Sequence, residues 1–174
     1  GLDRLSELLP PKKEKEEYYV FVVDEIHQKT GLMNRVSLSG DDLLVWANAD
    51  KEPTTFQVDE LTAKVKKNCG KLPSAIIAVG GGSVMDIGKG ISVMLTHEGS
   101  SSDYQGWDLL KRPGIYKIGV PTLSGTGAEA SRTAVFTGKE KKFGINSDYS
   151  MFDAVICDAT LLTTVPKDQR FYTA

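Results

Sequence analysis

The chain has 174 residues, of which 40% are apolar and 25% charged, and its formal net charge is −2 at pH 7. These values fit one globular domain or one lobe of a larger protein, and the slight negative charge argues against a nucleic-acid-binding surface. Cys69 and Cys157 are too few for a disulfide framework, and no apolar run approaches the length of a membrane span. We therefore expect a protein of the reducing cytoplasm that has no contact with a membrane.

The first part of the chain predicts short strands that alternate with helices. An amphipathic helix is expected at 2–9, and a β-rich run at 18–23 ends at Asp24. A second strand is expected at 43–46, followed by a helix that ends at Gly70. Alternation of strands and helices at this spacing is typical of a parallel, doubly wound sheet.

The run from Ser74 to Lys89 predicts a buried strand, a tight turn and a helix. Apolar residues fill 75–79, three glycines follow at 80–82, and apolar side chains then return at helical spacing. Glycine lets the backbone approach an anion closely, and the N–H groups of the first helical turn supply donors. Ser83 suits the cap of this helix. The segment therefore predicts a site for the phosphates of a nucleotide.

The spacing of this segment matches neither of two standard nucleotide motifs. Met85 stands where a Rossmann fingerprint requires a third glycine. A P-loop that ended at Gly88-Lys89 would require glycine at Ser83 and a hydroxyl residue at Gly90. A glycine-rich turn without any ligand is the alternative interpretation.

The later part of the chain predicts more strands. A polar loop is expected at 98–106, followed by a strand at 116–120. Residues 133–145 predict a hairpin, and 154–158 a further strand. The expected fold class is therefore α/β, with a Rossmann-like parallel sheet, flanking helices and a β-hairpin.

Residues 121–129 form a second loop of small residues, and this loop directly follows a strand. Taken alone, the loop predicts a turn with a helix cap. Ligands of parallel sheets bind beyond the carboxyl ends of the strands, where Asp24, the glycines at 80–82 and Thr122 all fall. The two loops together favour a dinucleotide as the ligand.

These two loops give the chain a resemblance to a known family. The pattern Gly-Gly-Gly-Ser-x-x-Asp-x-x-Lys at 80–89 and the loop 121–129 are similar to the cofactor lobe of the iron-containing (group III) alcohol dehydrogenases, relatives of dehydroquinate synthase. The resemblance implies the N-terminal lobe of a dehydroquinate-synthase-like fold with NAD as cofactor. It also implies Fe²⁺ or Zn²⁺ held by ligands outside this chain. The implied domains are an NAD-binding domain at 1–165 and the start of a helical metal-binding domain at 166–174.

The resemblance assigns cofactor contacts to individual residues. Asp24 ends the first strand as the family's ribose-binding acid does, and its charge would repel the 2′-phosphate of NADP; its alternative role is a helix cap. Lys142 falls where the family places a lysine near the nicotinamide ribose. Leu162 lies in a segment that usually reads Asp-Pro-x-Leu, although Ala159 here replaces the proline. The expected cofactor-binding residues are Asp24, Gly81, Gly82, Ser83, Asp86, Thr122, Ser124, Thr126, Lys142 and Leu162.

Other polar residues near the motifs have structural alternatives. Asp86 would bind the nicotinamide side or the substrate, or would only stabilise the start of its helix. Lys89 is expected to pair with Asp86 at i, i+3, which would make it structural. Glu129 is interpreted as a charge at a helix terminus. His27 and His97 are expected on the surface, and neither is expected to bind a metal.

The expected function is oxidation of a primary alcohol with NAD by a larger, metal-dependent enzyme of which this chain is the cofactor-binding part. No catalytic residue or metal ligand is assigned within the chain, because it lacks an Asp/His set at helical ligand spacing. Segments 43–50, 104–108 and 171–173 are similar to the branch of the family that oxidises C8 of 3-deoxy-D-manno-octulosonate, a lipopolysaccharide sugar. The expected partners are a small alcohol or sugar substrate and a second copy of the chain.

Two other functions remain open at this point. One is a lyase or cyclase of the dehydroquinate-synthase type, which uses NAD transiently. The other is a stand-alone nucleotide-binding module that catalyses no reaction.

Overall fold

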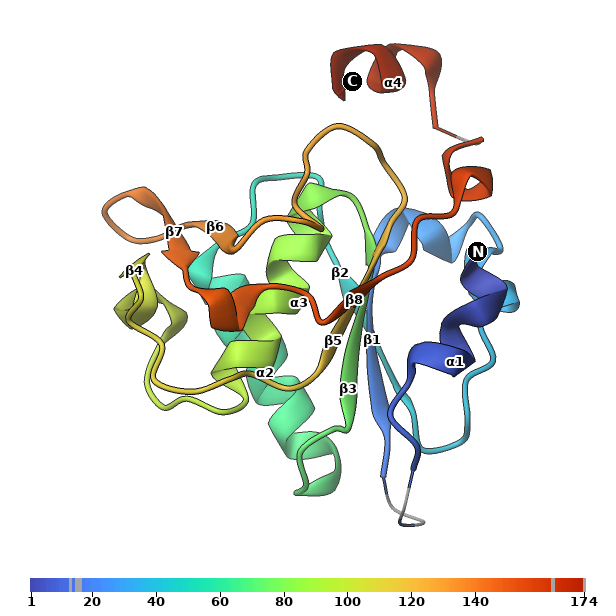
Figure 1. The fold of residues 1–174 in the computed structure, drawn as a ribbon. Helices are drawn as coiled ribbons and strands as arrows, with labels where there is room; N and C mark the ends of the chain where they lie inside the picture. The colour runs from blue at the N-terminus through green and yellow to red at the C-terminus, as the bar shows by residue number, and fades with distance from the viewer. Residues whose placement is uncertain (13, 15–16, 164, 174) are drawn as a thin grey trace.

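The computed structural model describes residues 1–174 except 13, 15–16, 164 and 174 (Figure 1). Its centre is a five-stranded sheet with the order β2-β1-β3-β5-β8, in which all paired strands run parallel. This confirms the predicted α/β fold class. The strands are β1 (Tyr19–Asp24), β2 (Leu43–Ala47), β3 (Ala75–Gly80), β5 (Lys117–Pro121) and β8 (Ala154–Val155).

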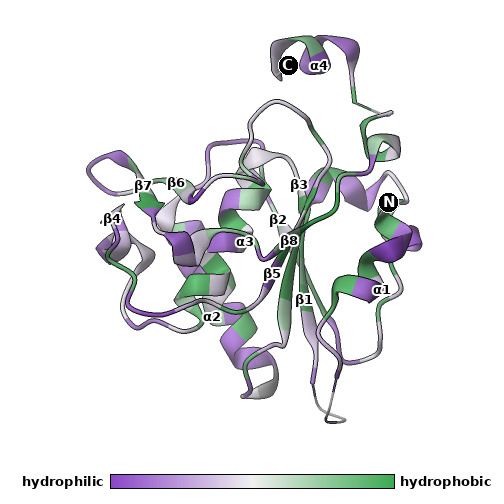
Figure 2. Ribbon diagram, in the orientation of Figure 1, coloured by the Kyte–Doolittle hydropathy of each residue, from purple (hydrophilic) through white to green (hydrophobic). Residues whose placement is uncertain are grey.

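The two central strands are buried on both faces of the sheet. Every residue of β3 is buried, and in β1 only the last residue, Asp24, is partly exposed. Val20 and Val22 of β1 point into one core, whereas Phe21 and Val23 point into the other. This alternation explains why both strands are continuous apolar runs in the sequence. Figure 2 shows these apolar residues along the strands at the centre of the molecule.

Two helices, α2 (Thr55–Cys69) and α3 (Gly82–Met94), cover one face of the sheet (Figure 1). Their buried side chains form one core with β1 and β3. The helix α2 begins at Thr54, whose hydroxyl accepts the N–H of Gln57, and ends at Gly70 in the left-handed conformation at φ 66°. The predicted end of this helix at Gly70 is therefore confirmed.

Shorter segments cover the opposite face. These are the 3-10 helix η1 (Leu2–Arg4), α1 (Leu5–Leu8), η3 (Leu32–Arg35) and η6 (Ala159–Leu162). The helix predicted at 2–9 is thus a 3-10 turn followed by a single α-helical turn. Asp158 connects η1 to η3 on this face. Its carboxylate accepts the N–H of Leu2 at 2.9 Å and a guanidinium N–H of Arg35 at 3.0 Å. These contacts and those to Thr160 hold the pKa of Asp158 well below its usual value.

A second, three-stranded sheet lies beside α3. It has the order β4-β7-β6, where β6 (Thr133–Thr137) and β7 (Lys142–Asn146) form the predicted antiparallel hairpin and β4 (Gly106–Trp107) pairs with β7. Three further 3-10 helices are η2 (Glu25–Gln28), η4 (Ser101–Tyr104) and η5 (Asp148–Ser150).

Two further sequence-based expectations need correction. The predicted loop at 98–106 contains η4, because Ser100 and Asp103 form a capping box there. The strand predicted at 154–158 stops at Val155, where pairing with β5 ends. The helix α4 (Lys167–Thr173) stands away from the body of the domain (Figure 1). No helix in the described part of the chain combines the length and apolarity needed to cross a bilayer.

Candidate cofactor site

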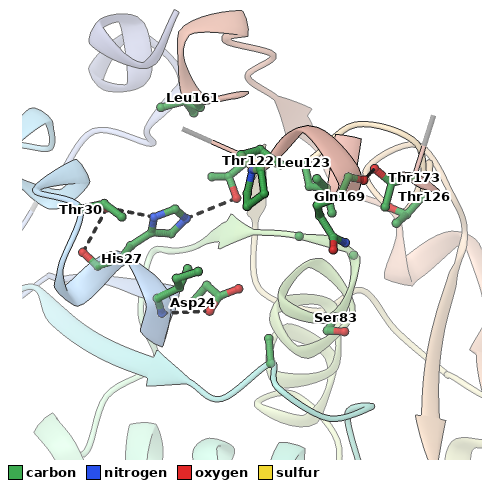
Figure 3. Close-up of a pocket in the computed structure, with 16 residues that line it drawn as sticks. Asp24, His27, Thr30, Ser83, Thr122, Leu123, Thr126, Leu161, Gln169 and Thr173 are labelled. Atoms are coloured by element: carbon green, nitrogen blue, oxygen red, sulfur yellow. Dashed lines mark hydrogen bonds between the residues drawn. The ribbon is translucent and has the colours of Figure 1, made fainter. Parts of the chain in front are cut away.

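A cavity of about 460 Å³ lies at the carboxyl ends of the parallel strands (Figure 3). Asp24 ends β1, Gly81 and Gly82 follow β3, and Thr122 follows β5, so three adjacent strands contribute to one cavity. This is the edge at which parallel sheets bind ligands. The other lining residues are Ile26, His27, Thr30, Ala49, Ser83, Leu123, Thr126, Leu161, Val165, Pro166, Gln169 and Thr173.

The three glycines of the turn differ in what an added side chain would contact. A Cβ at Gly80 would lie 2.7 Å from the side chain of Val84, and one at Gly82 would lie 3.0 Å from that of Thr126. A Cβ at Gly81 would make only an ordinary contact, at 3.8 Å. Packing therefore explains Gly80 and Gly82, whereas Gly81 leaves open space at the surface of the cavity.

The N-terminus of α3 carries no side-chain cap. The capping residue is Gly81 and not, as predicted, Ser83, which is the second residue of the helix. The N–H groups of a first helical turn have no acceptor within their own helix, and this end of a helix carries partial positive charge. Because Gly81, Gly82 and Ser83 line the cavity, these donors are available to an anionic ligand there.

Asp24 caps a 3-10 helix and also lines the cavity. Its Oδ1 accepts the N–H of Ile26 at 3.1 Å, which caps the 3-10 helix η2. Its carboxylate also lines the cavity. The capping role is therefore confirmed, and it leaves the charge of Asp24 at the edge of the candidate site.

His27 is a site residue that the sequence-based prediction missed, since it was expected on the surface. Only 8% of His27 is exposed, because η2 turns back over the strand end and places the ring in the cavity wall (Figure 3). Nδ1 lies 3.1 Å from Oγ1 of Thr30, and Nε2 lies 3.3 Å from Oγ1 of Thr122. Burial lowers the pKa of His27, and nearby Asp24 opposes this shift. The sequence did contain one signal for this position. His27 lies three residues after Asp24, and residues three apart in a 3-10 turn share a face.

Asp86 and Lys89 form a second buried polar cluster on α3. The Nζ of Lys89 lies 3.9 Å from Oδ1 of Asp86, which confirms the predicted pairing. Lys89 is completely buried, and its Nζ donates to the carbonyl oxygens of Ala128, Ser131 and Thr133 at 2.6, 2.8 and 2.9 Å. Burial lowers the pKa of Lys89 to about 8 and raises that of Asp86 to about 6. Lys89 thus ties α3 to the segment that follows the second small-residue loop.

Two further expectations about polar residues are wrong. His97 is buried, with Nδ1 2.8 Å from the carbonyl oxygen of Val93 and Nε2 accepting the N–H of Lys111 at 3.1 Å. The loop 121–129 does not lead into a helix, so Glu129 is not a helix-terminus charge. Glu129 instead borders a neighbouring cavity.

The predicted cofactor residues fall into three groups: those in the main cavity, those in a neighbouring cavity, and those in neither. The main cavity is lined by Asp24, Gly81, Gly82, Ser83, Thr122 and Thr126. The neighbouring cavity of about 230 Å³ is lined by Ser124 and Leu162, together with Cys157 and Glu129. Asp86 and Lys142 line neither of these two cavities. Asp86 accepts the N–H of Val135 at 3.1 Å, and exposed Lys142 pairs with Glu52.

Within the described residues, no group of three or more His, Cys, Asp or Glu side chains is placed to hold a metal ion. This part of the chain therefore does not fit a catalytic metal, which takes at least three protein ligands of these types.

Comparison with known proteins identifies the family of this chain. Residues 1–159 match the family model for iron-containing alcohol dehydrogenase. The chain belongs to the iron-containing alcohol dehydrogenase family. It is 31% identical to long-chain-alcohol dehydrogenase 1 of Geobacillus thermodenitrificans (strain NG80-2) in an alignment that covers 95% of this chain and 43% of that protein.

Solved structures share the fold of this chain. A 1,3-propanediol oxidoreductase superimposes with a TM-score of 0.83 at 26% identity, covering 99% of this chain and 45% of that one. The sulfoacetaldehyde reductase of Bifidobacterium kashiwanohense, solved in complex with NAD+, superimposes with a TM-score of 0.81 at 22% identity, covering 97% and 45%. The chain thus spans less than half the length of these family members.

Proposed function

We propose that this chain is the NAD-binding part of an iron-type alcohol or aldehyde oxidoreductase whose reaction requires further polypeptide. One observation carries the proposal: the uncapped N-terminus of α3, Asp24 and Thr122 meet in one cavity at the ends of three parallel strands. An anion site, a ribose-binding carboxylate and a hydroxyl beside apolar surface are the parts that a dinucleotide needs. Family membership supports the proposal.

Each part of NAD has candidate residues in this proposal. The backbone at Gly81 and Gly82, with Ser83, would bind the pyrophosphate, and Asp24 would accept hydrogen bonds from the adenosine ribose. Thr122 and Thr126 would hold the adenosine half, and Ser124 and Leu162 would extend this surface into the neighbouring cavity.

The nicotinamide half is assigned to the side of α3 that carries Asp86. Oδ1 of Asp86 is buried and makes no hydrogen bond within the described residues, which leaves an acceptor for an amide group. Lys142 would act near the nicotinamide ribose after release from Glu52. When bound, NAD supplies a hydride acceptor, while the residues of this chain bind and orient it.

Metal chemistry is assigned to residues outside the part of the chain that the structure describes. We retain the proposed division into an NAD-binding domain at 1–165 and the start of a metal-binding domain at 166–174, of which Ala174 lies outside the described residues. Dimerisation and a cytoplasmic location are likewise proposals.

The substrate is proposed at the level of a small alcohol or aldehyde. The relatives named above act, by their names, on long-chain alcohols, 1,3-propanediol and sulfoacetaldehyde. None of these names supports C8 of 3-deoxy-D-manno-octulosonate, so this compound is only one candidate in a substrate screen. The same names favour a dehydrogenase over a lyase or cyclase of the dehydroquinate-synthase type.

Calorimetric titration of the chain with NAD and NADP tests the proposed function. We expect weak binding of NAD, because this chain is less than half the length of its relatives, and weaker binding of NADP. Asp24→Asn keeps an oxygen that caps η2 but removes the charge that repels a 2′-phosphate, so it should remove most of the preference for NAD. Equal affinities for NAD and NADP in the unsubstituted chain would remove Asp24 from this role, and no binding of NAD would contradict the proposed function.

A further inference from the structure

The helix α4 and the turn before it form one wall of the main cavity. The residues that line the cavity from this side are Val165, Pro166, Gln169 and Thr173. Gln169 and Thr173 lie four residues apart and so share one side of α4. Figure 3 shows this helix across the cavity from the N-terminus of α3, whose residues 81–83 also line the cavity. A ligand in the cavity would therefore lie between two helices.

The orientation of α4 is the reverse of what apolar burial favours. Phe171 and Tyr172 do not line the cavity, and they are 80% and 82% exposed. Burial of apolar surface would turn these rings toward the domain. Polar Gln169 faces the cavity instead, although within the described residues no hydrogen bond or ion pair joins α4 to the sheet or to α3. The polar side of α4 thus faces the cavity without a protein partner.

The side-chain amide of Gln169 is the group on α4 that is available to a ligand. The hydroxyl of Thr173 donates to the main-chain carbonyl oxygen of Gln169 at 2.8 Å, so its proton stays within the helix. The amide of Gln169 has no partner in the described part of the chain, and Figure 3 shows it extending from α4 toward the end of α3 that carries Ser83. An amide group offers two N–H donors, and phosphate oxygens are acceptors.

We propose that α4 is the second wall of the cofactor site and that Gln169 donates a hydrogen bond to the pyrophosphate of NAD from the side opposite the N-terminus of α3. The inference rests on the proposed function, which assigns the pyrophosphate to Gly81, Gly82 and Ser83. Because α4 lacks polar contacts with the rest of the domain, the bound pyrophosphate would also attach α4 to it.

Calorimetric titration of the 174-residue chain and of Gln169→Leu tests the contact. Leucine has a similar size but no amide, so we expect NAD to bind about tenfold more weakly, the value of one hydrogen bond to a charged group. ADP carries the same pair of phosphates and should lose affinity by the same factor. Gln169→Glu places a carboxylate beside the phosphates, so its affinity for NAD should fall further and recover partly with added salt.

Phe171→Leu provides the matched control, because it changes an exposed side chain of the same helix that does not line the cavity. Its affinity for NAD should be unchanged. Gln169 is itself exposed, so neither substitution should affect folding, which circular dichroism checks. Hydrogen exchange supplies a second measurement: NAD should slow the exchange of the backbone amides at 167–173 in the unsubstituted chain and slow it less in Gln169→Leu.

Failure of the inference can be told apart from failure of the proposed function. Unchanged affinity for NAD in Gln169→Leu would overturn the inference and leave the proposed function intact. A loss of affinity for NAD but not for ADP would assign Gln169 to the nicotinamide half and would likewise overturn the contact with the pyrophosphate. Absence of NAD binding by the unsubstituted chain would overturn the proposed function and the inference with it.

Discussion

Lys89 is a buried ammonium group whose three protons have three carbonyl acceptors. Lys89→Met would retain the length and apolar stem but leave these carbonyl groups and Asp86 without their cation. We expect a loss of about 3 kcal/mol in the free energy of unfolding, measured by urea denaturation. The control is Lys64→Met on the exposed side of α2, which should change the free energy by less than about 0.5 kcal/mol. Equal stability of the two variants would contradict a structural role for Lys89.

Gly81 allows a test of the turn that leaves the packing of the domain unchanged. Its Cβ would make only an ordinary contact, so Gly81→Val should fold with an added side chain at the surface where the pyrophosphate is proposed to lie. We expect NAD to bind at least about tenfold more weakly in calorimetric titration, with an unchanged circular dichroism spectrum. Gly82→Val is less informative because its side chain would press on Thr126. If folded Gly81→Val bound NAD with unchanged affinity, the glycines at 80–82 would form a turn with no role in binding the cofactor.

The site residues that lie at the carboxyl ends of strands were predictable from the sequence. Asp24, Gly81 and Thr122 follow strand ends, and parallel strands bring such positions to one edge. The cap of α3 and the burial of His27 and His97 were not predictable in this way. They depend on how a turn of a few residues folds back, which neither spacing nor residue type settles.

The contact between α3 and β3 depends on the absence of a side chain at Gly88. A Cβ there would lie 2.6 Å from the Cβ of Ala78. Gly88→Ala should therefore lower the free energy of unfolding by about 1–3 kcal/mol through overpacking, despite the higher helix propensity of alanine. Gly40→Ala is the control, since a Cβ at Gly40 would have no atom within 4 Å. A more stable Gly88→Ala variant would show that the helix can shift away from the sheet at no cost.

At the scale of elements, the strands and helices with clear apolar patterns were predictable, whereas the 3-10 turns and the end of β8 were not. The strands β1 and β3 and the helices α2 and α3 carry clear apolar patterns and lie where the sequence indicates. The strand β8 is shorter than predicted because the apolar run 154–157 does not itself determine where pairing with a neighbouring strand ends. Only Ala154 and Val155 find partners on β5, and Asp158 then caps η6.

At the scale of the whole molecule, the chain is expected to bind its cofactor without catalysis. After treatment with a chelator and dialysis it should retain no stoichiometric Fe²⁺ or Zn²⁺, and it should form no NADH with primary alcohols, because the described residues provide no metal ligand set and the metal activates the alcohol oxygen. Elemental analysis and absorbance of NADH measure the two outcomes. One tightly held metal per chain, or measurable turnover, would contradict the proposed division of labour.

The parallel order of the five-stranded sheet also has a consequence for how the chain folds. Its paired neighbours all run parallel, so each pair requires a crossover and closes a long loop before it gains any contact. The hairpin of β6 and β7 needs only a short turn and can form within about 1–10 μs. The parallel sheet itself is expected to form more slowly, because its contacts join residues far apart in the sequence. Lys89 of α3 donates to the carbonyl oxygen of Thr133 at the start of this hairpin, so its burial requires the hairpin and the helix that covers the sheet to be in place together.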